Sequence, residues 1–189
     1  YAMFKALLFL GAGCIIHAVH SNEMSAMGGL RRYMPVTHAT FLIACLAIAG
    51  IWPLSGFFSK DEILTACFAF SPVMGWVMTG IAGLTAFYMF RLYYNIFWGR
   101  ENRELHAAHR PHEAPLTMTL PLLFLSAVTC VAGFIPFGKL VSSDGTAYAI
   151  HIDRGVAGVS LYVAAAAIAL ATWMYLRERQ TVADALATR

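Results

Sequence analysis

Residues 57–62 read Phe-Phe-Ser-Lys-Asp-Glu and place three ionisable side chains between two apolar runs. Lys60 and Asp61 are adjacent, so each influences how tightly the other holds a proton when both are kept from water. A lysine beside a carboxylate inside a membrane is therefore a candidate proton carrier. At the membrane surface, the same cluster would only mark the end of a helix.

Lys5 and His17, in the apolar run at the start of the chain, are further candidates for proton exchange. If a helix leaves the membrane near His20, Lys5 lies 15 residues earlier, which is about 22 Å along the helix axis. Within a hydrocarbon core of about 30 Å, a lysine at that depth either faces a polar cavity or extends its stem to the opposite surface. His17 and His20 lie at the predicted helix end, where an imidazole either bonds the last carbonyls or relays protons.

Three histidines spaced three apart, His106, His109 and His112, have a spacing that can bind a metal on a helix. Basic and acidic residues such as Arg110 and Glu113 lie among them, and no thiol or carboxylate set completes a metal site. We therefore expect a solvated charged loop and no metal.

The elements that position these residues must be membrane helices. Of the 189 residues, 59% are hydrophobic and 12% are charged, whereas about 25% are charged in soluble domains. A net charge of +3 with scattered cations does not form the basic patch of a nucleic-acid-binding protein. Because backbone groups in lipid need internal partners, the apolar runs must be helical. The sequence predicts an all-α membrane protein whose partners include the lipid bilayer and no nucleic acid.

No sequence feature indicates a bound cofactor. The chain contains no Gly-rich phosphate loop, nucleophile elbow or haem-ligating pair. Its four cysteines lie far apart in different apolar runs, which predicts packing roles rather than disulfides or a redox site: Cys14, Cys45, Cys67 and Cys130.

Five apolar units are long enough to cross a bilayer, since a span needs about 20 residues. They cover residues 1–19, 37–70, 73–98, 115–136 and 155–176. The second unit has two readings from the residues alone. A plain helix over 37–58 would leave Lys60 at the surface, or Pro53 and Gly56 would break the helix near mid-membrane, with helix resuming from Asp61.

The positive charges predict which loops face the cytoplasm. If each unit crosses once, loops 20–35 and 99–114 and the C-terminal tail share one side of the membrane. That side carries eight cations and the other side two, so the positive-inside rule makes the first side cytoplasmic. The eight are Arg31, Arg32, Arg100, Arg103, Arg110, Arg177, Arg179 and Arg189, and the two are Lys139 and Arg154.

Several longer motifs carry a resemblance to a known family. They are residues 2–13 (AMFKALLFLGAG), 27–35 (MGGLRRYMP), 50–64 (GIWPLSGFFSKDEIL), 85–91 (TAFYMFR) and 112–115 (HEAP). Together they resemble the antiporter-like membrane subunits of respiratory complex I, in particular the subunit L family of bacterial NADH:quinone oxidoreductase, whose mitochondrial counterpart is subunit 5.

The resemblance implies a fold and site residues. The family's core contains inverted repeats, each with a helix broken in mid-membrane, and the second unit here corresponds to such a helix. Lys5 matches a lysine of the central proton relay, and Lys60, with Asp61 beside it, matches the lysine at the helix break. Relatives typically have His where Tyr1 stands. Apolar sequence begins at Tyr1 without a signal peptide, so we expect a fragment that begins inside a helix. The family's glutamate and lysine couple lies on earlier helices, so the resemblance implies a C-terminal-half fragment that does not pump alone.

The resemblance also implies a function, partners and a location. Residues 1–98 would be the latter part of a proton-translocation repeat, and 99–189 the following helices, polar loops and start of the tail. The chain would belong to a proton-translocating enzyme complex of the bacterial inner membrane, next to another antiporter-like subunit. NAD, FMN, iron-sulfur clusters and quinone would bind other subunits. The alternatives are a sodium/proton antiporter subunit of the same superfamily and a non-transporting membrane scaffold.

Overall fold

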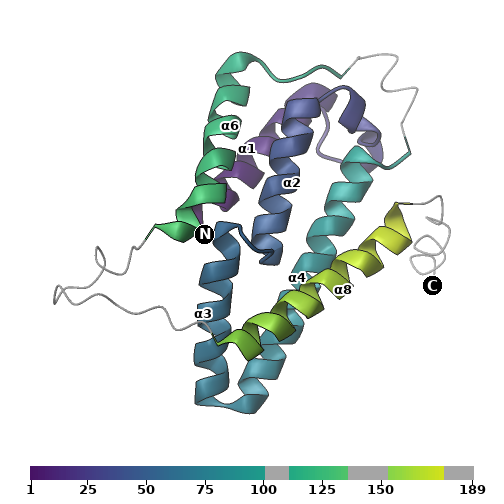
Figure 1. The fold of residues 1–189 in the computed structure, drawn as a ribbon. Coiled ribbons are helices and arrows are strands. Elements are labelled where there is room, and N and C mark those ends of the chain that lie inside the picture. The colour runs from purple at the N-terminus through teal and green to yellow at the C-terminus, as the bar shows by residue number, and fades with distance from the viewer. Residues whose placement is uncertain (101–110, 136–152, 177–189) are drawn as a thin grey trace.

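The computed structural model describes residues 1–100, 111–135 and 153–176, and these residues are helical with no strand among them (Figure 1). The prediction of an all-α protein is confirmed. The α-helices are α1 (Ala2–Val19), α2 (Pro35–Ala49), α3 (Ser55–Phe70), α4 (Pro72–Phe97), α6 (Leu116–Val131) and α8 (Arg154–Tyr175). Short 3-10 helices are η1 (Met24–Ala26), η2 (Leu30–Arg32) and η3 (Ala132–Phe134).

Four helical segments in the described part of the chain are long and apolar enough to cross a membrane. They are α1, α4, α6 extended through η3, and α8. The helix α2 is apolar but has 15 residues, which is short of a full span at 1.5 Å per residue. Counted together with α3, it completes the five predicted units.

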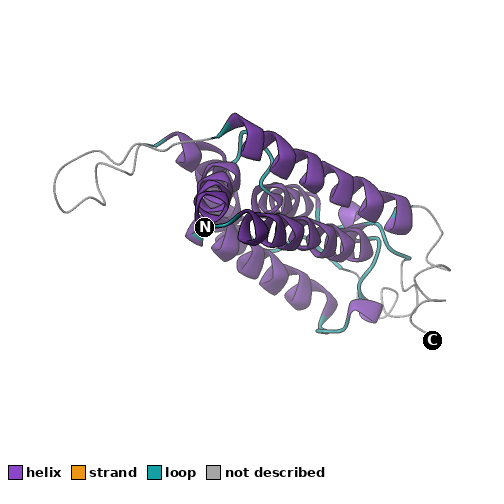
Figure 2. Cartoon of the chain, turned by 90° about the horizontal axis from the view of Figure 1, so that it is seen from below, coloured by secondary structure: helices purple, strands orange, loops and turns teal. Residues whose placement is uncertain are grey.

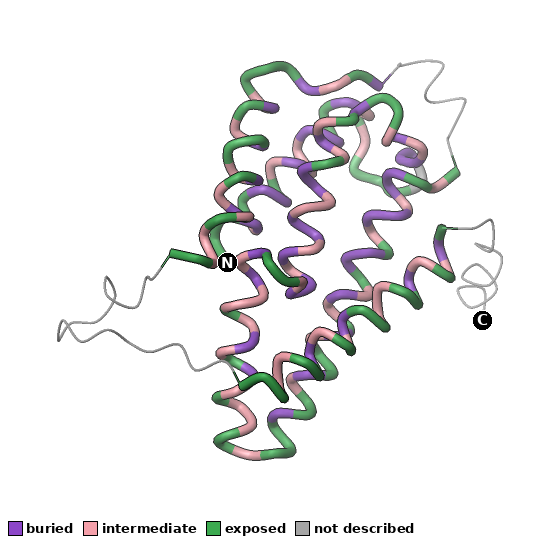
Figure 3. The backbone as a smooth tube through the Cα atoms, viewed as in Figure 1, coloured by how far each residue is buried: buried purple, intermediate pink, exposed green. Residues whose placement is uncertain are grey.

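Many large apolar side chains of these helices are exposed, and the exposed residues appear as green segments of the backbone in Figure 3. Phe9 is 75% exposed, Phe70 83%, Leu116 80% and Tyr162 76%. Soluble monomers rarely expose apolar surface on this scale. The helices therefore present their outer faces to lipid or to further membrane helices, as expected for a multi-pass membrane protein.

The helices pack around α2, which contacts α1, α4 and α6. The helices α3 and α4 form an antiparallel hairpin that turns at Ser71, and α8 crosses α4 diagonally (Figure 1). Figure 2 shows the helices and their connecting loops from below. A small residue lies at this crossing, because a Cβ on Gly83 would come within 2.6 Å of Val163. Close backbone approach at small residues is typical of helix packing in membranes.

A Schellman motif ends α2 in the middle of the second predicted unit. Gly50 has φ 80°, its N–H donates to the Ala47 carbonyl, and the Ile51 N–H donates to the Leu46 carbonyl. This pattern stops a helix and places the residue after its end in the left-handed region, which glycine adopts readily. The Ala49 carbonyl is left available for a partner outside the helix.

The second unit is therefore a broken helix, as the second of the two readings predicts, and the plain helix over 37–58 is wrong. The prediction was also wrong about where helix resumes. It resumes at Ser55 rather than Asp61, because the Schellman motif and Pro53 interrupt the helix before the charged cluster. Gly56 acts by close contact rather than flexibility, since a Cβ there would overlap the Ala47 carbonyl.

The segments that follow α1 and α4 meet at one end of the bundle. The Arg31 guanidinium lies 3.7 Å from the centre of the Trp98 ring, and Gly28 packs directly against the Arg100 backbone. This contact agrees with both loops sharing one side, but which side faces the cytoplasm stays a prediction. Arg103, Arg110, Lys139 and the tail arginines lie outside the described residues.

Candidate functional site

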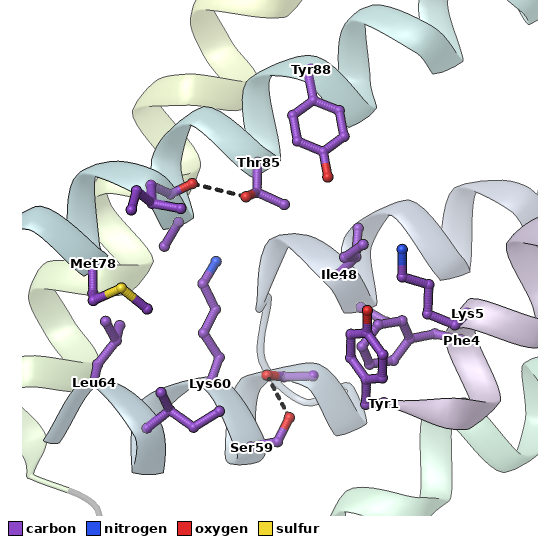
Figure 4. A pocket seen from close by; sticks show the side chains of 15 residues that line it. Tyr1, Phe4, Lys5, Ile48, Ser59, Lys60, Leu64, Met78, Thr85 and Tyr88 are labelled. Carbon is purple, nitrogen blue, oxygen red and sulfur yellow. Dashed lines mark hydrogen bonds between the residues drawn. The ribbon is translucent and has the colours of Figure 1, made fainter. Parts of the chain in front are cut away.

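Lys5 and Lys60 line the same cavity, although they come from different helices and lie 55 residues apart. The cavity has a volume of about 340 Å³, and Figure 4 shows both side chains at its wall. Other side chains with polar groups around it are Tyr1, Ser59, Thr85 and Tyr88. The cavity therefore brings together the two lysines that the sequence singled out.

Lys60 binds the end of the broken helix. Its Nζ donates a 2.8 Å hydrogen bond to the Ala49 carbonyl, one of the carbonyls that α2 leaves without a helical partner. The C-terminal end of a helix carries partial negative charge, so it stabilises an ammonium group there. The helix break thus supplies a binding site for the protonated form of Lys60 inside the bundle.

Gly50 leaves the space that this lysine occupies. A Cβ at Gly50 would lie 2.8 Å from Lys60 Cδ and 3.4 Å from Lys60 Nζ. The same glycine thus provides both the left-handed turn that ends α2 and the room for the lysine that binds its last carbonyl.

Asp61 lies on a different face of α3 from Lys60, because successive residues on a helix point about 100° apart. It is 1% exposed, and its Oδ1 accepts a 2.7 Å hydrogen bond from Ser160 Oγ of α8. Its Oδ2 is buried with no hydrogen-bond partner among the described residues. The adjacent pair therefore connects two regions, since Lys60 faces the cavity and Asp61 faces α8.

Lys5 is partly buried in the first half of α1, one turn after Tyr1. Its Nζ lies 5.7 Å from the centre of the Tyr1 ring, within the range of a cation–π contact. Tyr1 therefore contacts this lysine through its aromatic face.

The predicted histidine candidates do not join this cavity. His17 is exposed in the last turn of α1, and its ring centre lies 6.0 Å from that of His20. His112 is exposed, and His106 and His109 lie outside the described residues. Within the described part of the chain, no group of three metal-ligating side chains is close enough to hold an ion.

Glu113 is a partly buried residue with a structural role, whereas sequence reasoning placed it in a solvated loop. Its carboxylate accepts hydrogen bonds from the Val36 N–H at 2.8 Å and the Thr37 hydroxyl at 2.6 Å. It therefore caps the N-terminus of α2, where negative charge is stabilised. The signal available in the sequence was Pro35, which marks a helix start but does not identify the distant carboxylate.

A second polar contact that the sequence reasoning missed joins α2 to α4. His38 Nε2 and the Tyr93 hydroxyl are 2.6 Å apart, and Trp98 Nε1 donates to the same hydroxyl at 3.4 Å. Aromatic residues at a span's end predict an interfacial belt, but nothing in the pattern shows that Tyr93 turns inward to a histidine.

The described helices form an apolar bundle with a broken helix and two partly buried lysines at one cavity. Ionisable groups inside membrane bundles mark pathways for ions or protons, and interrupted helices recur at transporter binding sites. The fold and the site together are those of a multi-pass membrane protein with a lysine held at a helix break, an arrangement that recurs among transporters.

Similarity to known proteins identifies the family within that class. Residues 1–85 match the family described as NADH:quinone oxidoreductase/Mrp antiporter, transmembrane. NAD(P)H-quinone oxidoreductase chain 5 of Picosynechococcus sp. is 39% identical over 220 residues, which cover 95% of this chain and 33% of that protein. NADH-quinone oxidoreductase subunit L of Mycobacterium tuberculosis is 46% identical over 151 residues, covering 77% and 23%.

A chloroplast relative shows the same similarity. The chloroplastic NAD(P)H-quinone oxidoreductase subunit 5 of Chaetosphaeridium globosum is 43% identical over 148 residues, which cover 71% of this chain and 22% of that protein. The chain therefore belongs to the family of antiporter-like membrane subunits of NADH:quinone oxidoreductases, and the resemblance stated from its motifs is confirmed. It spans about a third or less of the length of these relatives.

Proposed function

We propose that this chain is part of a proton-translocating membrane subunit of NADH:quinone oxidoreductase. The family supports the enzyme complex, and the cavity shared by Lys5 and Lys60 supports the transport role. In this proposal, electron transfer from NADH to quinone takes place in other subunits, which hold NAD, FMN, iron-sulfur clusters and quinone. The chain itself contributes the path for protons and contacts a neighbouring antiporter-like subunit.

The observation that carries the proposal is the position of Lys60 at the helix break. Protonated Lys60 is held by the Ala49 carbonyl, and water in the cavity can connect it to Lys5 on the opposite wall. Release of that proton leaves a neutral amine, which is compatible with an apolar surrounding. Asp61, the next residue along the helix, is the acceptor that leads away from the cavity. Movement of charge elsewhere in the complex would alternate these two states.

The test is a pair of substitutions at Lys60 in the full-length subunit, assembled in its complex. Lys60→Ala removes the exchangeable proton, and Lys60→Arg keeps a positive charge that does not deprotonate in proteins. Both variants should lose most proton uptake per electron transferred to quinone, measured together in sealed vesicles. Arg32→Ala, which removes an exposed cation away from the cavity, should pump normally.

Unchanged pumping in Lys60→Ala would refute the role of Lys60. Normal pumping in Lys60→Arg together with loss in Lys60→Ala would show that the residue is needed for its charge alone. That second result would favour the scaffold alternative, in which the ammonium group only holds α2 and α3 in register.

A sodium/proton antiporter subunit is the second candidate, because the family description also names Mrp antiporters. The two functions differ in their driving reaction. Proton uptake driven by NADH oxidation in sodium-free vesicles supports the first, whereas proton movement that requires a sodium gradient and no quinone supports the second.

Residues 1–98 would hold the transport machinery, with the later helices packed against it. The proposed location is the bacterial inner membrane, with loops 20–35 and 99–114 and the tail in the cytoplasm. A cysteine introduced at Asn22 should then react with an impermeant thiol reagent only from the cytoplasmic side. Labelling from the opposite side would reverse the proposed topology.

A further inference from the structure

Asp61 has one side-chain hydrogen-bond partner in the described part of the chain, and that partner lies on α8. Ser160 Oγ is 2.7 Å from Asp61 Oδ1 and 3.4 Å from the Ala157 carbonyl of its own helix. A serine hydroxyl has a single proton to donate, and the shorter distance assigns it to the carboxylate. Both residues are buried, at 1% exposure for Asp61 and 6% for Ser160.

The Asp61–Ser160 hydrogen bond joins α8 to α3, whereas α8 packs mainly against α4. The buried residues Ala164 and Ala171 lie on α8, and a hydrogen bond of 2.7 Å joins the side chains of Tyr94 and Thr172. Ser160 lies near its N-terminal end, where α8 also contacts α3 (Figure 1). The serine therefore connects α8 to the charged residue next to Lys60.

We propose that Ser160 is a positioning residue for Asp61, and that α8 controls through it which carboxylate oxygen exchanges protons. The hydroxyl occupies Oδ1 and fixes the side chain's rotation, so Oδ2 is the oxygen left to take a proton. A donated hydrogen bond also stabilises the ionised carboxylate relative to the acid. The consequence of this proposal for transport rests on the proposed proton-translocating role of Lys60 and Asp61. The positioning of Asp61 by the hydrogen bond does not depend on that role.

Reaction with dicyclohexylcarbodiimide tests the proposal without measuring transport. The O–H of a protonated carboxyl adds across one C=N bond of the reagent, and the O-acylisourea then rearranges to a stable N-acylurea. Labelling at Asp61 is quantified by mass spectrometry of the α3 peptide from the full-length subunit in its complex. Asp61→Asn identifies any label that belongs to the neighbouring Glu62.

Ser160→Ala should increase the labelling rate at Asp61 by about tenfold, because a hydrogen bond to a charged group is lost. Ser160→Thr keeps the hydroxyl and should label at nearly the parent rate. Thr172→Val is the matched control, because it removes the hydrogen bond between Thr172 of α8 and Tyr94 of α4. This variant should leave labelling at Asp61 unchanged. The same labelling in the parent and in Ser160→Ala, including its absence from both, would overturn the proposal.

Proton uptake in the same variants distinguishes a failure of the positioning role of Ser160 from a failure of the proposed transport function. Ser160→Ala should pump less per electron than Ser160→Thr if Asp61 carries protons. Changed labelling with normal pumping in both Ser160→Ala and Lys60→Ala would leave the positioning role intact and reject the transport role. An equal labelling change in Thr172→Val would show that α8 acts only through packing, which rejects the positioning role.

Discussion

Gly50 is the residue at which a minimal substitution most directly tests the link between the helix break and Lys60. Gly50→Ala adds one methyl group in a backbone with φ 80°, and the left-handed region costs an L-residue about 1–2 kcal/mol. The added Cβ would also lie 2.8 Å from Lys60 Cδ. The lysine must move, which weakens its bond to Ala49 and adds roughly 1 kcal/mol or more.

Two further variants separate these contributions. Asparagine tolerates the left-handed region better than alanine, so Gly50→Asn reduces the backbone cost while its Cβ still meets Lys60. Gly50→Ala in a Lys60→Ala background removes the clash but keeps the backbone cost. Gly80→Ala is the control, because Gly80 is exposed on α4 and a Cβ there meets nothing within 4 Å.

The assays are thermal unfolding of the purified full-length subunit in detergent and proton uptake by the assembled complex. Gly50→Ala should lower the unfolding midpoint more than Gly50→Asn does, whereas both should impair proton uptake. The effect of Gly50→Ala on stability should be smaller in the Lys60→Ala background, with a coupling of about 1 kcal/mol for contacting residues. Full proton uptake by Gly50→Asn, or equal destabilisation in both backgrounds, would refute the steric link to Lys60.

Two other substitutions test the ends of the broken helix. Glu113→Ala should destabilise the subunit by about 1–2 kcal/mol, because the Val36 N–H and the Thr37 hydroxyl lose their acceptor. Glu113→Gln keeps an acceptor oxygen and should lose less stability. Equal unfolding midpoints for the two variants would contradict a capping role. Gly56→Ala should reduce the amount of folded subunit on size-exclusion chromatography more than Gly80→Ala does, since its Cβ overlaps the Ala47 carbonyl, and normal yield would show that α2 and α3 can separate freely.

The sequence alone predicted the membrane helices and most of their bounds. Long apolar runs are a local signal, because each helix satisfies its own backbone and needs no partner for that purpose. The predicted unit 73–98 and the helix Pro72–Phe97 differ by one residue at each end. The charged cluster was also visible as a candidate site, since lysine and aspartate are rare within apolar sequence.

The break in the second unit was recognisable but its position was not. Gly50, Pro53 and Gly56 are all helix-breaking residues within seven positions, and propensity ranks them without showing which one ends the helix. The structure assigns the end to Gly50, because its hydrogen bonds complete a Schellman motif. Gly56 instead allows α3 to begin against the last turn of α2.

The sequence by itself determined that this protein is a set of apolar helices with a lysine and a carboxylate in one of them. The tertiary structure alone decided what these groups contact. Lys60 bonds a carbonyl 11 residues away, Asp61 a hydroxyl 99 residues away, and Glu113 a helix start 77 residues away. Periodicity reports which residues share a helix face, but partners at such separations depend on how helices cross, and the crossings are set by packing of the whole bundle.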